Sequence, residues 1–129
     1  MHKHNFLDSF GFAFAGIAEA VKTSRNLKIH LSATIIVTLA GLYYQIEIAE
    51  WRILFLLFGM VISAEIMNSA IEETCNVYDE KLNLPYGTTK IPRNMAAGAV
   101  LIMAIISVIV GIILFLPYIL QWNNILYPM

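Results

Sequence analysis

The sequence predicts an all-α membrane protein in which an N-terminal amphipathic interfacial helix precedes three transmembrane helices. Of the 129 residues, 59% are hydrophobic, and the mean hydropathy is +0.71. A soluble domain of this length leaves roughly a third of its unfolded surface exposed to water, so it has no place for so much apolar surface. Long charge-free segments alternate with short charged ones, as in chains that cross a bilayer several times. The whole chain, 1–129, is therefore interpreted as a single integral-membrane domain.

The composition also argues against several other classes of protein. The net charge of −1 argues against a nucleic-acid-binding surface, which needs a basic surplus. A single cysteine, Cys75, excludes an intramolecular disulfide, and the three histidines lack the ligand spacing of a zinc site. The N-terminal segment does not resemble a cleaved signal peptide, because Asp8, Glu19 and Lys22 interrupt it before a long apolar core can form.

The first predicted element is a helix over about 5–24. Its apolar side chains recur every three or four residues and therefore share one helical face, namely Phe6, Phe10, Phe14, Ile17 and Val21. A helix with this pattern can lie in the membrane interface with its phenylalanines buried in lipid. The alternative is an ordinary amphipathic helix that packs on protein.

Three transmembrane helices are expected over about 29–46, 51–75 and 95–120. The first contains a charge-free stretch, 31–46, and two further residues bring it close to the roughly 20 needed to span 30 Å of hydrocarbon. The second continues, in helical register, into the polar sequence EIMNSAIEETCN. The third has no charge, and its small side chains suit close helix packing in lipid; they include Ala97, Ala104, Ser107 and Gly111.

Charges and aromatic residues predict the same orientation. The basic residues cluster before the first span and between the second and third, namely Lys3, Lys22, Arg25, Lys28, Lys81, Lys90 and Arg93. The positive-inside rule places both segments and the N-terminus in the cytoplasm, with the C-terminus outside. The aromatic side chains expected at the outer interface are Tyr43, Tyr44, Trp51, Tyr118 and Trp122.

The second span carries the candidate catalytic residues. Glu65, Asn68, Ser69 and Glu72 are spaced i, i+3, i+4 and i+7, so they share one helical face. At 1.5 Å per residue, Glu65 lies about 21 Å from Trp51 and Glu72 about 31 Å, which places Glu65 in the cytoplasmic half of the bilayer and Glu72 at the inner water boundary. An acid inside a membrane helix is costly and is usually functional. The alternative is a polar seam that only holds helices together.

The segment AEIMNSAIE at 64–72 resembles the signature of the small prokaryotic diacylglycerol kinase family, whose Gram-positive branch phosphorylates undecaprenol. Further segments resemble the family in the same order along the chain: RNLKIH at 25–30, GLYYQIEIAEW at 41–51 and MAAGAVLI at 95–102. Together they cover most of residues 10–116. The pattern E-x-x-N-[ST]-A-x-E is fairly specific within a three-span chain this short.

The resemblance implies a homotrimer in the bacterial inner membrane that uses ATP and Mg²⁺ to phosphorylate a lipid alcohol, with undecaprenol favoured and diacylglycerol next. It implies that Glu65 is the general base and that Asn68 orients the reacting groups. Nucleotide contacts are implied for Arg25, Asn26, Glu72, Arg93 and Asn94, and Mg²⁺ binding for Glu72 and the position of Ser24. Membrane lipids and the lipid substrate are the other expected partners.

The spacing of the two acids also suits phosphoryl transfer to a lipid. A lipid alcohol lies near the headgroups while ATP is in the cytosol, and Glu65 and Glu72 are about 10 Å apart along the helix axis. No glycine-rich phosphate loop of either common type is present, which argues against a conventional soluble kinase.

Three positions that carry carboxylates in the family pattern are neutral here: Ser24, Asn76 and Asn94. Glu19 is not expected to replace the acid at Ser24, because five residues of continuous helix rotate it by roughly 140°. The segment 77–91, expected to be a cytoplasmic loop, also departs from the family. The main alternative function is therefore a catalytically weakened or inactive family member that acts as a non-enzymatic membrane protein and makes no phosphorylated lipid. A proton or ion transporter is a weaker third alternative.

Overall fold

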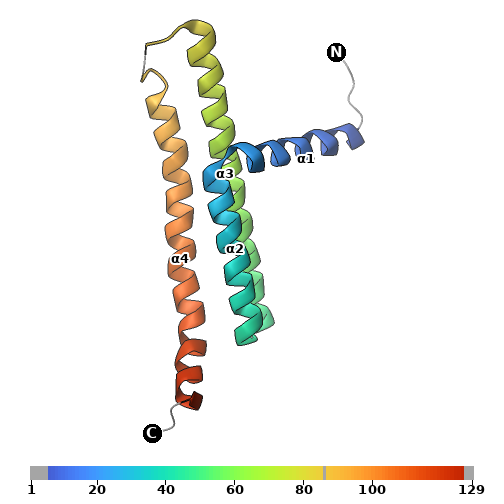
Figure 1. Ribbon diagram of the computed structural model, residues 1–129, viewed down its shortest axis with the longest axis vertical. Coiled ribbons are helices and arrows are strands. Elements are labelled where there is room, and N and C mark those ends of the chain that lie inside the picture. Colours follow the sequence, from blue (N-terminus) through green and yellow to red (C-terminus); the bar gives the residue numbers. More distant parts are fainter. Residues whose placement is uncertain (1–5, 86, 127–129) are drawn as a thin grey trace.

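The computed structural model describes residues 6–85 and 87–126, and over these ranges it contains four helices and no strand. The helices are α1 (Phe6–Thr23), α2 (Arg25–Tyr44), α3 (Ile48–Leu82) and α4 (Lys90–Leu126). Helices α2, α3 and α4 are each long and apolar enough to cross a membrane. Figure 1 shows these three running along the long axis of the molecule, while α1 projects sideways. The prediction of an all-helical chain with three candidate spans is confirmed.

Ser24 separates α1 from α2. Its backbone is extended (φ −82°, ψ 118°), which ends α1, and its hydroxyl accepts a hydrogen bond from the N–H of Leu27, as an N-cap residue does. Leu27 is completely buried beneath this first turn of α2. The break allows α1 to leave the bundle, and the side chains of Phe10, Phe12 and Phe14 are exposed on it. An interfacial position for α1 stays a prediction that these exposed phenylalanines suit.

A short turn, Gln45–Glu47, joins α2 to α3. Gln45 adopts the left-handed conformation (φ 52°), which ends α2. Glu47 then caps α3, and its backbone N–H donates to the Glu50 carboxylate at 2.8 Å in a capping box. The helix therefore starts at Ile48, and the connection predicted at 47–50 was placed too late, because Glu50 belongs to the first helical turn.

Helix α3 extends further than the predicted second span. It continues to Leu82 and ends where Asn83 adopts the left-handed conformation (φ 49°), just before Pro85. Residues 77–82, expected to begin a loop, therefore form a helix that protrudes with the start of α4 beyond the level of α1 (Figure 1). No helix-breaking residue occurs in this stretch, so the polar composition alone suggested a loop.

The predicted outer end of the bundle is closed by aromatic packing. The buried cluster of Ile46, Leu54 and Leu114 is covered by partly buried side chains that include Tyr44, Trp51, Phe115 and Tyr118. The Tyr118 hydroxyl donates a hydrogen bond to Glu50, which ties α4 to the first turn of α3. Tyr44, Trp51 and Tyr118 thus lie together at one end, and the ring of Tyr43 lies 5.1 Å from that of Tyr44. The side chain of Trp122, the fifth predicted interface aromatic, is outside the described residues.

Helices α2 and α4 both pack on α3. Between α2 and α4 lies an apolar groove of about 500 Å³, lined by side chains that include Val37, Leu57, Ala104, Ser107 and Gly111. The Ser107 hydroxyl in this groove is buried and has no hydrogen-bond partner among the residues described. Small side chains of α4, among them Ala104 and Gly111, line one wall of this groove.

Candidate active site

Glu65 and Asn68 are the buried polar side chains of the described ranges, at 1% and 2% exposed. The hydroxyl of Ser24 donates a hydrogen bond of 2.9 Å to Oε1 of Glu65, across 41 residues of sequence. Oε2 of Glu65 is buried and has no partner in the part of the chain that the structure describes. The carboxylate is therefore held at one oxygen, while the other is available to accept a proton.

Asn68 lies on α3 between the buried Glu65 and the exposed Glu72. Its Nδ2 donates to Oε1 of Glu72 at 3.2 Å, which confirms that these two residues share one face of α3. Its Oδ1 is buried without a partner among the described residues, as is the hydroxyl of Ser69. Glu72, in contrast, is exposed. This face of α3 therefore carries a buried carboxylate at Glu65 and an exposed one at Glu72, two helical turns apart.

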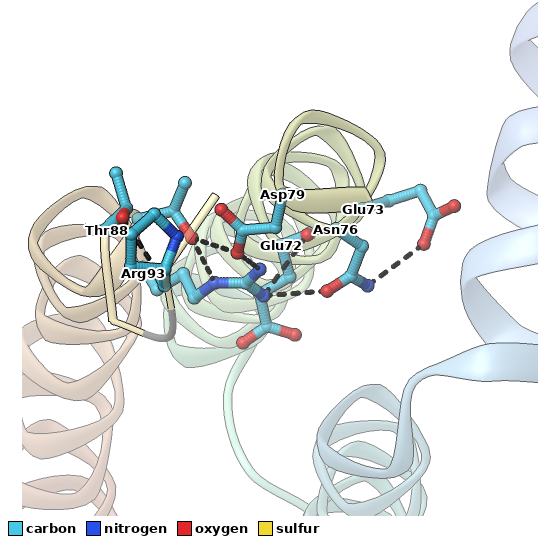
Figure 2. Close-up of polar contacts among 8 residues, drawn as sticks. Glu72, Glu73, Asn76, Asp79, Thr88 and Arg93 are labelled. Atoms are coloured by element: carbon cyan, nitrogen blue, oxygen red, sulfur yellow. Dashed lines mark hydrogen bonds and ion pairs between the residues drawn. The ribbon is translucent and has the colours of Figure 1, made fainter. Parts of the chain in front are cut away.

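Arg93 lies beyond Glu72 and reaches from α4 to α3, as Figure 2 shows. Its guanidinium donates to Asn76 Oδ1 at 2.9 Å, to Asp79 Oδ2 at 3.1 Å and to the backbone carbonyl of Glu72 at 3.4 Å. Its Nε donates to the Thr89 hydroxyl at 3.1 Å, and that hydroxyl donates to Asp79 at 2.6 Å. Arg93 is therefore fixed in orientation and stands over the exposed end of the acidic face.

A cleft of about 600 Å³ lies between α1 and α3. Its α1 wall is largely apolar and its α3 wall is polar; the lining includes Phe12, Ile17, Glu19, Ser24, Ser69, Glu72, Glu73 and Asn76. Asn76 also donates to Glu73 at 3.3 Å (Figure 2). The cleft can accommodate an amphiphile, because one wall offers hydrocarbon and the other offers hydrogen-bonding groups.

Glu19 lines the same cleft as Glu72, contrary to the expectation that it is rotated away from the site. That expectation assumed one continuous helix through Ser24. The helix breaks at Ser24, so the angular relation between positions 19 and 24 no longer follows the helical period. Glu19 is therefore a carboxylate near the site, although its own ion pair with Lys22 (3.8 Å) is exposed.

Three of the predicted nucleotide contacts stand apart from this network. Arg25 and Asn26 are exposed in the first turn of α2, directly after Ser24, and Asn94 is exposed in α4 beside Arg93. Among the residues described, no hydrogen bond or ion pair joins them to Glu65 or Glu72. They lie near the rim of the site by position along the helices, but the fold of one chain does not bring them into contact with it.

The oxygen groups of this end suit Mg²⁺ held jointly with a nucleotide. In the described ranges, no group of three His, Cys, Asp or Glu side chains forms a metal site by itself. Mg²⁺ commonly binds through one or two carboxylates together with substrate phosphates and water. Glu72, exposed on the cleft with Glu73 and Glu19, supplies hard oxygen ligands of that kind.

Sequence reasoning overlooked Asp79 as the partner of Arg93. Asp79 follows Glu72 by seven residues and Asn76 by three, so it continues the same helical face. The helical spacing of these polar residues could therefore have placed Asp79 on the same face of the helix. It was missed because the helix was expected to end near 75, whereas α3 runs to Leu82.

Comparison with known proteins adds a second line of evidence. The sequence model for prokaryotic diacylglycerol kinase matches residues 11–115. The undecaprenol kinase of Bacillus subtilis (strain 168) is 39% identical over 114 residues, which cover 88% of this chain and 90% of that protein. The diacylglycerol kinase of Synechocystis sp. is 38% identical over 118 residues, which cover 91% of this chain and 66% of that protein. No solved structure matches the chain significantly.

Proposed function

The chain belongs to the prokaryotic diacylglycerol kinase family, and we propose that it is a lipid kinase that transfers the γ-phosphoryl group of ATP to a membrane lipid alcohol. The observation that carries the proposal is the change from a buried to an exposed carboxylate along α3. Glu65 is buried with an unpaired carboxylate oxygen, and Glu72, two turns further on, is exposed on a cleft. The related kinases favour this function over a non-enzymatic membrane protein.

Glu65 is the proposed general base. The alcohol oxygen forms a bond to the γ-phosphorus as the bond to the ADP oxygen breaks, and the hydroxyl proton passes to the carboxylate. Oε2 of Glu65 is the oxygen without a partner in the described chain, so it is the atom that accepts this proton. Asn68, between the two acids, is proposed to orient the reacting groups, and its free Oδ1 supports that role.

Glu72 is the proposed ligand of Mg²⁺, which when bound neutralises charge on the nucleotide phosphates. Arg93 is proposed to contact the phosphates, because its guanidinium stands over the exposed end of the face and has the planar donor geometry that suits phosphate oxygens. Arg25, Asn26 and Asn94 remain proposed nucleotide contacts at the rim. The resemblance also implied Mg²⁺ binding at the position of Ser24, whose hydroxyl donates a hydrogen bond to Glu65 instead.

The length of α2 supports a position for the proposed reaction near the inner boundary of the hydrocarbon core. Its 20 residues rise about 30 Å, close to the thickness of the hydrocarbon core. Ser24 stands at the start of α2 and contacts Glu65, so Glu65 lies near the inner boundary of that core. Glu72 is about 10 Å further along α3, in water. A lipid hydroxyl and a cytosolic nucleotide can therefore meet between the two acids.

We also propose the orientation and assembly. The basic residues near Ser24 and in the α3–α4 hairpin favour a cytoplasmic N-terminus in the bacterial inner membrane, with the C-terminus outside. α1 is proposed to lie in the inner interface. The proposed assembly is a homotrimer, and the small side chains along the groove between α2 and α4 support helix packing from a second copy there.

Undecaprenol is the favoured acceptor, because its kinase in Bacillus subtilis is similar to this chain over nearly the whole length of both proteins. Diacylglycerol is the second candidate. Purified protein in mixed micelles should phosphorylate undecaprenol faster than diacylglycerol when given ATP and Mg²⁺. Sedimentation of the same sample should give the mass of three chains.

Glu65→Gln should lower kcat by about 10²–10⁴-fold, the usual contribution of a general base, because the amide cannot take the proton. Glu80→Gln is the matched control, since Glu80 is exposed on the same helix, does not line the cleft and should leave kcat within about twofold. The proposal fails if neither lipid is phosphorylated, or if Glu65→Gln turns over like the wild type.

A further inference from the structure

The hydroxyl of Ser24 takes part in two hydrogen bonds of opposite direction. It accepts from the N–H of Leu27 at 3.1 Å, and it donates to Oε1 of Glu65 at 2.9 Å. A serine hydroxyl has one proton, and the Leu27 N–H can only donate. An ionised carboxylate has no proton to donate, so the Ser24 proton lies in the bond with Glu65 and Oε1 accepts it.

This bond makes the two oxygens of the Glu65 carboxylate different. Oε1 is occupied by Ser24, while Oε2 is buried and unpaired in the described chain. A hydrogen bond to the carboxylate also fixes its rotation, so that Oε2 keeps one direction. Without the Ser24 proton, a side chain with Glu65's three rotatable bonds would have no polar contact to hold it in the described ranges.

The fold holds Ser24 itself in place. Its backbone N–H donates to the Ala20 carbonyl at 2.8 Å, at the end of α1, and its hydroxyl caps α2. The buried Leu27 anchors the capped turn. Ser24 also lines the cleft between α1 and α3, which Glu65 does not line. It therefore stands where the cleft, the break between helices and the buried carboxylate meet.

We propose that Ser24 is a positioning residue, which holds Glu65 so that Oε2 is the oxygen that takes the proton of the lipid alcohol. This inference rests on the proposed function of Glu65 as the general base. In the step, the alcohol O–H bond breaks, its proton binds Oε2, and the alcohol oxygen bonds to the γ-phosphorus as ADP leaves. Ser24 keeps its own proton throughout and takes no part as a ligand of Mg²⁺.

Two substitutions separate this role from helix capping. Threonine and glycine are N-caps of similar strength, but only threonine keeps a hydroxyl. The extended backbone at position 24 (φ −82°, ψ 118°) suits a β-branched residue. Ser24→Thr and Ser24→Gly should therefore unfold at similar temperatures, while only Ser24→Thr keeps the hydrogen bond to Glu65.

The expected result is a kcat close to that of the wild type for Ser24→Thr and about 10- to 100-fold lower for Ser24→Gly, the usual effect of losing a hydrogen bond to a charged group. The KM values for ATP and lipid should change little in both variants. Ser32→Ala is the control, because its exposed hydroxyl bonds only to a carbonyl of its own helix.

Equal kcat values for Ser24→Thr and Ser24→Gly, whether reduced or unchanged, would overturn the proposal, because the hydroxyl would then have no role beyond the cap. Recovery of Ser24→Gly at higher Mg²⁺ concentration would also overturn it, in favour of a metal ligand. The proposed function is judged separately, by turnover of the wild type and its loss in Glu65→Gln.

Discussion

The two ends of the helical bundle are built differently. At the predicted outer end, Trp51, Tyr118 and their neighbours cover a buried apolar cluster, and the Tyr118 hydroxyl bonds to Glu50. At the other end, buried polar atoms of Glu65, Asn68 and Ser69 have no partner within the described residues. Buried polar groups are usually paired, so these unpaired atoms require an explanation, such as a catalytic role or a bound water or ion.

Because the two ends differ, substitutions at one end should change mainly the stability of the fold, and substitutions at the other mainly the rate of turnover. The aromatic side chains at the predicted outer end pack on a cluster of their own chain, so changes there should affect folding and leave turnover intact. The polar end protrudes beyond α1 and carries a cleft, so changes there should affect turnover more than folding (Figure 1). Three further substitutions test this comparison.

The largest effect is expected for Glu72→Gln at the polar end. Loss of a charged oxygen ligand should raise the Mg²⁺ concentration needed for half-maximal rate and lower kcat/KM for ATP by about 10- to 100-fold. The thermal midpoint should change little, because Glu72 is exposed and its bond from Asn68 can be made to a glutamine oxygen. A Mg²⁺ titration of lipid phosphorylation measures the effect. A Mg²⁺ requirement identical to that of the wild type would remove Glu72 from the metal site.

An intermediate effect, on stability alone, is expected for Gly41→Ala at the outer end. A Cβ at Gly41 would lie 2.9 Å from the ring of Trp51, whereas one at Gly59 meets nothing within 4 Å. Both substitutions gain the same helix propensity, so the difference between them isolates the clash. Gly41→Ala should be about 1–3 kcal/mol less stable than Gly59→Ala when unfolding in micelles is followed by circular dichroism. If kcat fell as well, the two ends would not be independent.

The smallest effect is expected for Tyr118→Phe. It removes the hydroxyl that bonds to Glu50 and accepts from the Glu47 N–H at 3.4 Å, and it should lower the thermal midpoint slightly. Glu50 keeps its capping bond to Glu47, so α3 should still begin at Ile48. The same unfolding measurement detects the change, with turnover of the folded protein as its control. An unaltered midpoint would mean that aromatic packing alone closes this end.

Periodicity accounted for the elements but not for their ends. The 3-to-4 spacing of Glu65, Asn68 and Glu72 placed them on one face, and the hydrogen bond between Asn68 and Glu72 agrees with it. The end of α3 was misjudged, because the polar continuation of an apolar helix resembles a loop in composition. Its continuation brings Asp79 to Arg93, 14 residues away in sequence, and that distance is beyond any local pattern.

The sequence by itself determined the helices, their apolar lengths and the acidic face of α3, because each depends on residues that are neighbours along the chain. Tertiary structure alone decided that α1 turns away at Ser24, that Glu19 joins the cleft, and that Ser24 meets Glu65 across 41 residues. The physical reason is that a single extended residue redirects a whole helix, and the contacts that follow depend on the new direction rather than on the helical period.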